Sequence, residues 1–157
     1  MKNKKHNVVP ILKDSYLRII RNSIGTRLFR NFYAIVDGKK KDILRGGDLS
    51  CAYFVSCVLR IFGLIKDIHT TVLGTISDIK KSGWKIVKVP KPGSVLVWEK
   101  QKFGQEEHRH IGFYIGNKKA ISNSSVKQNV KRTPVEHSFT FGRKRSIQAI
   151  YWHKKLN

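Results

Sequence analysis

The spacing of apolar residues changes once along this chain, near Trp84, and this change most constrains the fold. Before it, apolar residues recur every three or four positions, as on a helix that faces a core. After it, short runs rich in Val and Ile alternate with Pro, Gly and Asn, which is typical of strands joined by turns. Helices followed by short antiparallel strands indicate an α+β domain, with the helices packed on one side of a small sheet or half-barrel.

The first half of the chain predicts three helices. The first begins at Tyr16, with Ser15 as its N-cap, and ends near Gly25. The other two cover Cys51–Phe62 and Thr70–Lys81. The second of these is apolar nearly all round and is therefore expected to be buried. A glycine-rich loop leads into it, with Asp48 or Ser50 as the N-cap.

The second half predicts five strands and the turns between them. The strands are Ser94–Trp98, His110–Ile115, Ala120–Ser124, Pro134–His137 and Ile147–Trp152. Pro90–Gly93 and Gly116-Asn117 are turn signals. The polar segment Lys100–Arg109 is expected to be a loop, and the basic run Arg143–Arg145 a solvated turn.

A length of 157 residues suits one domain. We expect residues 1–12 to form a basic arm and residues 13–157 to form the domain. No apolar run reaches the roughly 20 residues that a membrane-spanning helix needs, so we expect no integral membrane contact. The N-terminal residues lack the apolar centre of a signal peptide, which predicts a cytoplasmic or non-classically released protein.

The net charge of +22 is spread along the whole chain rather than gathered in one tail. A basic globular surface attracts polyanions such as nucleic acid, anionic lipid or an anionic cell-wall polymer. Charge alone selects none of them, because a surface that serves only solubility has the same composition.

The two cysteines, Cys51 and Cys57, lie too far apart on one helix to form a disulfide, so both are expected to be thiols. Cys51 begins the helix, where backbone N–H groups and the helix dipole favour a thiolate and can hold an oxyanion. Cys57 lies mid-helix among apolar residues and is assigned to the core. A reactive cysteine with a distant histidine is a candidate nucleophile and base.

Three blocks of sequence point to a family. Leu49–Val55 reads LSCAYFV, Pro92–Trp98 reads PGSVLVW, and His110–Asn117 reads HIGFYIGN. In this order they resemble the DCSGFV, PGDLVFW and HVGIYIGNG blocks of the NlpC-type papain-like peptidases of bacterial cell walls, which are related to the CHAP amidases. The resemblance covers roughly residues 30–152 and implies a papain-like fold.

Matched position by position, the resemblance implies Cys51 as nucleophile and His110 as general base. The family's third polar residue lies on the next strand and orients the imidazole; ungapped matching gives Ser122, and Asn123 is one step further. Strand alternation lets only one of the two face His110. We favour Asn123, because an amide oxygen accepts the imidazole N–H more firmly than a hydroxyl. Tyr33 matches a tyrosine that the family places at the oxyanion site.

The activity that the resemblance implies is thiol-dependent amide hydrolysis by a peptidase or amidase. Its substrate would be a peptide or peptidoglycan, with an anionic cell-wall polymer as a further partner, and we expect no cofactor and a monomeric chain. Two departures bear on the substrate: Ser50 stands where the family has Asp, and Ala52-Tyr53 where it has Ser-Gly. In the family, that Asp and Ser help to bind the peptide stem.

Two rival interpretations remain open. His108 and His110 would share one face of a strand and could bind a metal, but no close cysteine pair or zinc-protease motif accompanies them, and we expect no metal site. A non-catalytic basic protein on the same fold, binding an anionic polymer or nucleic acid, is the alternative to an enzyme. The tryptophans could stack on bases, but they lie in apolar segments, so nucleic acid is not the expected partner.

Overall fold

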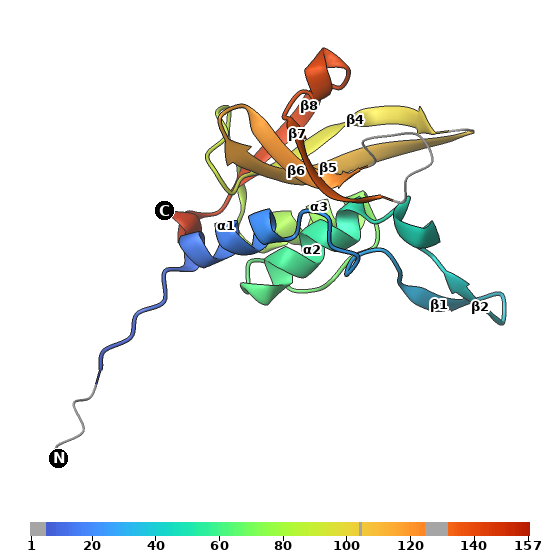
Figure 1. Cartoon of the computed structure of the whole chain (residues 1–157), viewed down its shortest axis with the longest axis horizontal. Coiled ribbons are helices and arrows are strands. Elements are labelled where there is room, and N and C mark those ends of the chain that lie inside the picture. Colours follow the sequence, from blue (N-terminus) through green and yellow to red (C-terminus); the bar gives the residue numbers. More distant parts are fainter. Residues whose placement is uncertain (1–5, 104, 125–131) are drawn as a thin grey trace.

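The computed structural model describes residues 6–103, 105–124 and 132–157. Within these residues, three α-helices lie against one face of a six-stranded antiparallel sheet, and a two-stranded hairpin projects from the body (Figure 1). The helices are α1 (Leu12–Asn22), α2 (Cys51–Ile61) and α3 (Val72–Lys81). This mixed architecture agrees with the expected α+β class.

The hairpin and the larger sheet differ in how they are built. β1 (Tyr33–Val36) and β2 (Lys39–Asp42) pair only with each other. The larger sheet has the strand order β3-β8-β4-β5-β6-β7. Its strands are β3 (Lys85–Ile86), β4 (Val95–Phe103), β5 (Glu106–Gly116), β6 (Lys119–Ser124), β7 (Thr133–Ser138) and β8 (Ile147–Trp152). Short 3₁₀ turns are η1 (Arg45–Gly47), η2 (Phe141–Arg143) and η3 (Lys154–Leu156).

The β4–β5 hairpin is longer than the sequence predicts. A loop is expected over Lys100–Arg109, but Gln101 pairs with His108 and Lys102 with Glu107 in antiparallel register. That prediction is wrong because backbone hydrogen bonds hold a two-stranded ribbon, and its solvated faces need no apolar alternation. The extension carries β5 past the start of α2 and provides one wall of the cavity described below.

The first helix also begins earlier than expected. Ile11 occupies the N-cap position of α1 and Ser15 lies inside the helix, so the predicted cap at Ser15 is wrong. Residues 6–11, the described part of the expected basic arm, have no regular structure, and residues 1–5 lie outside the described residues. Of the helices in the described chain, none combines the length and apolar character needed to cross a bilayer.

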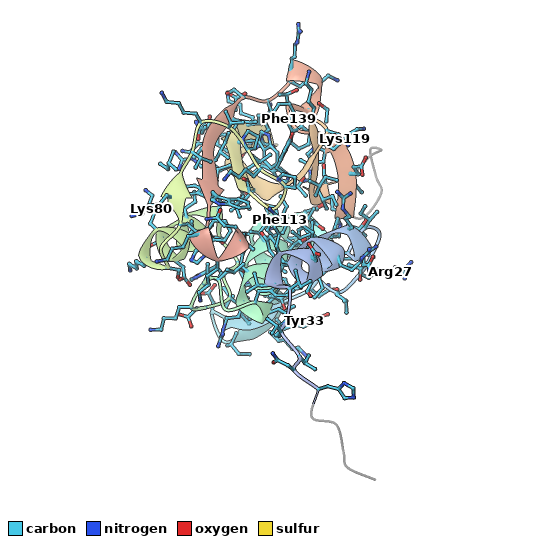
Figure 2. The ribbon with its side chains drawn as sticks, turned by 90° about the vertical axis from the view of Figure 1, so that its left-hand side faces the viewer. Arg27, Tyr33, Lys80, Phe113, Lys119 and Phe139 are labelled. Carbon is cyan, nitrogen blue, oxygen red and sulfur yellow. The ribbon has the colours of Figure 1, made fainter. Side chains whose placement is uncertain are left out.

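The main core lies between the helices and the sheet. Phe113 of β5 makes edge-to-face contacts with Phe54 of α2 and Tyr16 of α1, at centroid distances of 5.5 and 5.7 Å. Figure 2 shows Phe113 between the sheet and the helices, whereas Phe139 lies on the other side of the sheet. Aromatic contacts of this kind fix the position of α2 relative to β5.

A smaller apolar cluster covers the opposite face of the sheet. Because successive side chains of a strand point to opposite faces, Val97 joins the main core while Leu96 and Trp98 join this second cluster. Phe139 and Phe141 pack over it. The expected burial of the tryptophans is confirmed, since each of them is at most 7% exposed.

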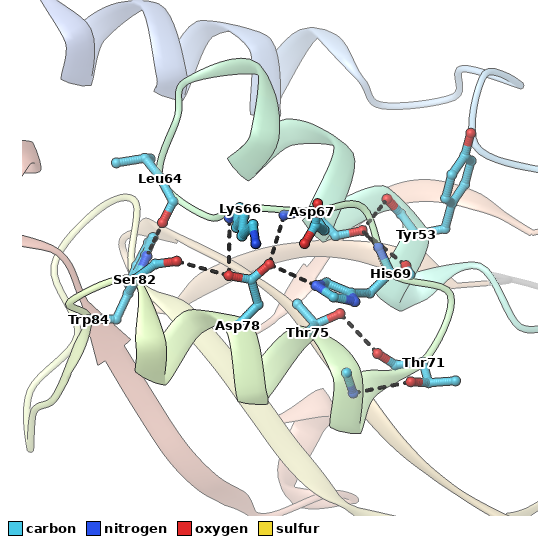
Figure 3. Close-up of polar contacts among 12 residues, drawn as sticks. Tyr53, Leu64, Lys66, Asp67, His69, Thr71, Thr75, Asp78, Ser82 and Trp84 are labelled. Carbon is cyan, nitrogen blue, oxygen red and sulfur yellow. Dashed lines mark hydrogen bonds and ion pairs between the residues drawn. The ribbon is translucent and has the colours of Figure 1, made fainter.

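A buried carboxylate ties the loop after α2 to α3 (Figure 3). Asp78 accepts the backbone N–H groups of Lys66 and Asp67 at 3.0 and 2.8 Å, the Ser82 hydroxyl at 2.9 Å and His69 Nε2 at 2.8 Å. Burial alone would raise the pKa of Asp78, but these hydrogen bonds hold it well below its usual range. We call these five residues the Asp78 clamp.

Candidate active site

A cavity of about 960 Å³ opens where the first turn of α2 meets the β4–β5 ribbon and η2. Cys51 and His110 both line it, although 58 positions separate them in the sequence. Pockets that bind small ligands commonly measure roughly 300–1,000 Å³. The structure therefore brings the predicted nucleophile and the predicted base to one cavity of suitable size.

The loop before α2 is shaped by a glycine. Gly47 has a φ of 108°, and a Cβ there would lie 2.8 Å from the carbonyl oxygen of Arg132, so another residue would not fit. Ser50 takes the N-cap position, one of the two expected, but its hydroxyl donates to the Gly47 carbonyl at 3.0 Å. No side chain of the described residues therefore caps α2, and the N–H groups of its first turn stay available at the Cys51 end.

The Cys51 thiol is held in its neutral form. Burial raises its pKa, against the opposing effects of the Ile111 and Ala52 backbone N–H groups and of the Arg145 and Arg132 charges. The sequence argument for a thiolate at the helix start is therefore outweighed, because removal of water disfavours the charge more than the helix start favours it. The N–H of Ile111, directly after His110, places the sulfur beside β5.

His110 lies at one end of a series of hydrogen bonds. Its Nε2 is 2.8 Å from Ser122 Oγ on β6, and the same oxygen is 2.7 Å from Nε2 of His137 on β7. His137 Nδ1 is in turn 2.8 Å from the carbonyl oxygen of Ser138. We call His110, Ser122 and His137 the histidine–serine chain.

The imidazole of His110 is also neutral at rest. Burial lowers its pKa well below the ordinary value, and the charges of Arg145, His137 and Arg132 lower it further. Among the described residues, no hydrogen bond joins this ring to the Cys51 thiol. The resting pair at neutral pH is therefore a thiol and a neutral imidazole that face one cavity without a direct bond.

Asn123 points away from His110. Its Nδ2 donates to the Gly47 carbonyl at 2.8 Å, so it anchors the loop before Cys51 from behind. The expected order of the two candidates is reversed for contact with the imidazole, because strand alternation turns Ser122 toward His110 and Asn123 toward η1. The Oδ1 of Asn123 is buried and has no hydrogen-bond partner among the described residues.

Tyr33 does not reach the cavity. It lies on β1 in the projecting hairpin, 60% exposed, with the Lys40 ammonium 4.9 Å from its ring (Figures 1 and 2). It is absent from the cavity lining within the described chain. The predicted oxyanion role fails on geometry, because residues 33–42 form a two-stranded hairpin and do not fold back over Cys51.

The two histidines of the H-x-H pattern contact different partners. His108 Nε2 lies 2.9 Å from Glu106 on its own strand, and that carboxylate also pairs with Arg45. Across the described part of the chain, no three His, Cys, Asp or Glu side chains gather closely enough to hold a metal ion. His108 lines the cavity, and its hydrogen-bond partner is the carboxylate of Glu106.

Cations dominate the cavity walls. Arg145 is half-buried; its Nε donates to the Glu99 carbonyl at 2.9 Å and its Nη2 to the His108 carbonyl at 2.7 Å. The predicted solvated turn at Arg143–Arg145 is therefore wrong for Arg145, which ties η2 to the β4–β5 ribbon. Ionisable residues in the lining are Asp48, Lys100, Lys102, Glu107, Arg109, Arg132, Lys144 and Arg145, besides the histidines and Cys51.

Cys57 differs from Cys51 in its position relative to the cavity. It lies outside the cavity lining of the described residues and is part-buried rather than fully buried in the core as expected. Burial raises its pKa to about 11, although a hydrogen bond with Tyr53 opposes the shift. Both cysteines are free thiols, as predicted.

The residues that depart from the family pattern serve the packing here. Ser50 is fully buried and bonded to Gly47. Tyr53 packs its ring against Phe29 and Phe32, at centroid distances of 6.4 and 5.3 Å. Of the two positions that bind the peptide stem in the family, Ser50 is bonded to the loop before α2 and Ala52 is buried in the main core.

Comparison with known proteins gives no relative. A scan against protein-family models finds no match to this chain, and a search of curated proteins finds no significantly similar sequence. The site must therefore be interpreted from its own geometry.

Sequence reasoning gave too little weight to two residues of the cavity. His137 lies on β7, and one strand, β6, separates it from His110 on β5, so only the β5–β6 and β6–β7 pairings bring the two histidines together. Arg145 sits in a basic run that reads as surface. The signal for His137 was strand register: Ser122 pairs with Val135, so His137, two residues further along β7, lies on the same face of the sheet as Ser122.

Proposed function

We propose that this protein is a thiol-dependent amide hydrolase of the NlpC-type papain-like class, with Cys51 as the nucleophile and His110 as the base. One observation carries the proposal: Cys51, at the uncapped start of α2, and His110, held by Ser122, line the same cavity. The order of helices before strands and the three sequence blocks support a papain-like fold.

In the proposed reaction, a neutral thiol gives its proton to a neutral imidazole as the attack begins. The Cys51 proton passes to His110 Nδ1 while the sulfur forms a bond to the substrate carbonyl carbon. First-turn N–H groups of α2 stabilise the oxyanion. His110 then returns the proton to the leaving nitrogen as the C–N bond breaks, which leaves a thioester on Cys51.

Water completes the cycle. His110 takes a proton from water as the hydroxide attacks the thioester carbonyl, and the C–S bond breaks to release the carboxylic acid. The proton returns to the sulfur, so the resting thiol and imidazole are restored. The hydrogen bond that this requires between thiol and imidazole would form on substrate binding, since catalytic hydrogen bonds often tighten only in the complex.

The cavity charge supports an anionic substrate. Among the described residues, six lysines and arginines but only two carboxylates line the cavity, and Arg145 donates to two carbonyl oxygens, which do not neutralise its charge. A carboxylate-bearing wall peptide fits this field, and an anionic wall polymer fits the net charge of +22. Binding to isolated cell walls should weaken as salt rises from 50 to 500 mM, roughly following screening; salt-independent binding would contradict the electrostatic part of the proposal.

A non-catalytic binding protein on the same fold is the second candidate. It is favoured by the raised pKa of Cys51, which burial produces, and by the missing bond between thiol and imidazole. Such a protein would keep its binding of polyanions when Cys51 is replaced by Ala and would show no acyl transfer.

An activated ester tests the enzyme hypothesis without a known substrate. Wild-type protein mixed with p-nitrophenyl acetate should release one burst of p-nitrophenol per chain, with the acetyl group found on Cys51 by peptide mass spectrometry. Cys51→Ala should abolish the burst, and Cys57→Ala, the matched control, should retain it. Equal acetylation of both cysteines, or a burst that survives in Cys51→Ala, would overturn the proposal. Release of peptides from purified peptidoglycan then identifies the bond.

A further inference from the structure

We propose that His137 is a positioning residue for this site: acting through Ser122, it fixes which ring nitrogen of His110 carries the proton. The inference rests on the proposed function and deepens it, because the nitrogen left without a proton is the one that would receive the proton of Cys51. It adds a residue from β7, one strand beyond the strand that supplies the imidazole's direct partner.

His137, at the far end of the histidine–serine chain, determines which atom donates in each of its hydrogen bonds. His137 Nδ1 lies 2.8 Å from the carbonyl oxygen of Ser138, and a carbonyl can only accept, so Nδ1 carries the hydrogen. Burial lowers the pKa of His137, so the ring is neutral near pH 7 and its Nε2 holds a lone pair. His137 therefore presents an acceptor to Ser122.

The lone pair on His137 Nε2 determines the orientation of the Ser122 hydroxyl, and the hydroxyl then determines the tautomer of His110. The Ser122 hydroxyl has one hydrogen, which it donates to His137 Nε2 across 2.7 Å. Its oxygen can then only accept from His110, whose Nε2 lies 2.8 Å away and must carry a hydrogen. A neutral imidazole has one N–H, so His110 Nδ1 is the basic nitrogen.

Packing keeps the chain in this geometry. The His137 ring stacks on Phe141 at 3.9 Å with an interplanar angle of 19°, and Trp98 lies against both histidine rings at 5.4 and 5.7 Å. Ser122 is fully buried and His110 is 6% exposed, so water has little access to compete for their hydrogen bonds.

The charged groups around His137 act in opposite directions. Glu136 on β7 raises its pKa and Lys119 on β6 lowers it, and these two residues form an ion pair at 3.7 Å. Across the sheet, His110 is the titratable neighbour, and Arg145 and Arg132 face His110. Among the residues facing the chain, no carboxylate contacts either histidine ring within the described structure.

Loss of His137 frees the serine hydroxyl to turn. In His137→Ala, Ser122 can donate to His110 Nε2, which stabilises the tautomer protonated on Nδ1. That tautomer cannot take the proton of Cys51. In His137→Gln, the side-chain Oε1 can still accept from Ser122, so the wild-type direction is preserved.

Histidine tautomers are read directly by ¹⁵N NMR of the full chain labelled at histidine. At pH 7.5 we expect His110 protonated on Nε2 and His137 on Nδ1, and a shift of His110 toward Nδ1–H in His137→Ala. His153→Gln is the matched control, because His153 also bonds a backbone carbonyl, that of Ser82 at 3.0 Å, away from the cavity. His110 protonated on Nδ1 in the wild type, or unchanged by His137→Ala, would overturn the inference.

Acetylation of Cys51 by p-nitrophenyl acetate supplies the kinetic test. His137→Ala should slow it about tenfold and His137→Gln less, whereas His153→Gln should leave it unchanged. Equal loss in the Ala and Gln variants would contradict a positioning role and indicate a packing role. If the wild type shows no acetylation but has the expected tautomers, the proposed function fails while the hydrogen-bond chain stands, so the two failures are distinguishable.

Discussion

Two histidine networks in this protein use the same side chain in opposite ways. In the Asp78 clamp, His69 meets a carboxylate that three other donors also satisfy, so the network ties a loop to α3. In the histidine–serine chain, His110 meets a hydroxyl whose other partner is a second imidazole. The first network joins parts of the chain, whereas the second faces a cavity with a cysteine in it.

The difference lies in what each network does to proton affinity. A fully hydrogen-bonded carboxylate has its pKa lowered and stays charged, which makes it a fixed anchor. A chain without a carboxylate leaves both imidazoles neutral, since burial lowers the pKa of His110 and of His137. A neutral histidine next to a thiol can take a proton, so only the second network suits acid–base chemistry.

Removal of His110 should have the largest effect on chemistry. His110→Ala is expected to slow acetylation of Cys51 by about 10²–10⁴-fold, the usual contribution of a general base. The stability of the α3 region should change little, because the clamp shares no residue with the cavity lining. Stopped-flow release of p-nitrophenol measures the rate; a loss of less than a few-fold would remove His110 from the mechanism.

Removal of Asp78 should have the largest effect on stability. Asp78→Ala leaves two part-buried backbone N–H groups, the Ser82 hydroxyl and His69 without their acceptor and should cost about 3 kcal/mol of unfolding free energy. The acetylation rate of the folded fraction should stay at the wild-type value. Denaturant unfolding gives the cost, and Asp67→Ala, an exposed carboxylate that contributes only its backbone, is the matched control. Equal losses in the two variants would contradict the clamp.

The sequence predicts these two regions unequally. The sequence shows Cys51 at the start of a buried helix and His110 on a core-forming strand, because helix caps and strand alternation are local patterns. The sequence does not decide between Ser122 and Asn123. Strand alternation says that one of them faces the imidazole, but it does not say which. Which of the two residues faces His110 depends on the register in which β5 pairs with β6, and this register is a long-range property of the backbone.

Longer-range features were missed for related reasons. The partnership of His137 with His110 depends on the β6–β7 pairing, and residues 125–131, which join these strands, lie outside the described residues. The ribbon over Lys100–Arg109 forms from polar residues that carry no strand signal. Tyr33 was matched by likeness alone, and the hairpin it belongs to takes it away from the cavity.

The two networks should respond to acid at different pH values. Burial holds the pKa of His110 and His137 below the ordinary 6.5, so both stay neutral as pH falls to 6.5 and become charged only below it. Acetylation should therefore be constant through pH 6.5 and then fall. The stabilisation from Asp78, whose pKa is lowered, is fully present above the ordinary Asp value of about 3.9 and is lost only as pH falls through its folded value.

Below pH 6.5 the protein should therefore lose acetylation while it is still folded, because Asp78 keeps its charge to a pH well below its ordinary value. Acetylation rates and circular dichroism on the same samples measure both limits. Loss of structure that coincides with the loss of acetylation would show that one network, not two, controls the acid response.

Replacement of one histidine by glutamine in each network should have the smallest effect on stability. The two variants should differ in whether acetylation of Cys51 changes. His69→Gln keeps an N–H donor near Asp78, and the carboxylate retains three other hydrogen bonds, so unfolding free energy should fall by only about 1 kcal/mol, with acetylation unchanged. His137→Gln should also leave stability nearly intact but slow acetylation slightly, and less than His137→Ala does, because Oε1 can still accept from Ser122 while the flexible amide lacks the ring's bond to the Ser138 carbonyl. Paired thermal unfolding and burst kinetics on the two variants decide the point: a slower burst in His69→Gln would mean that the clamp also serves the site.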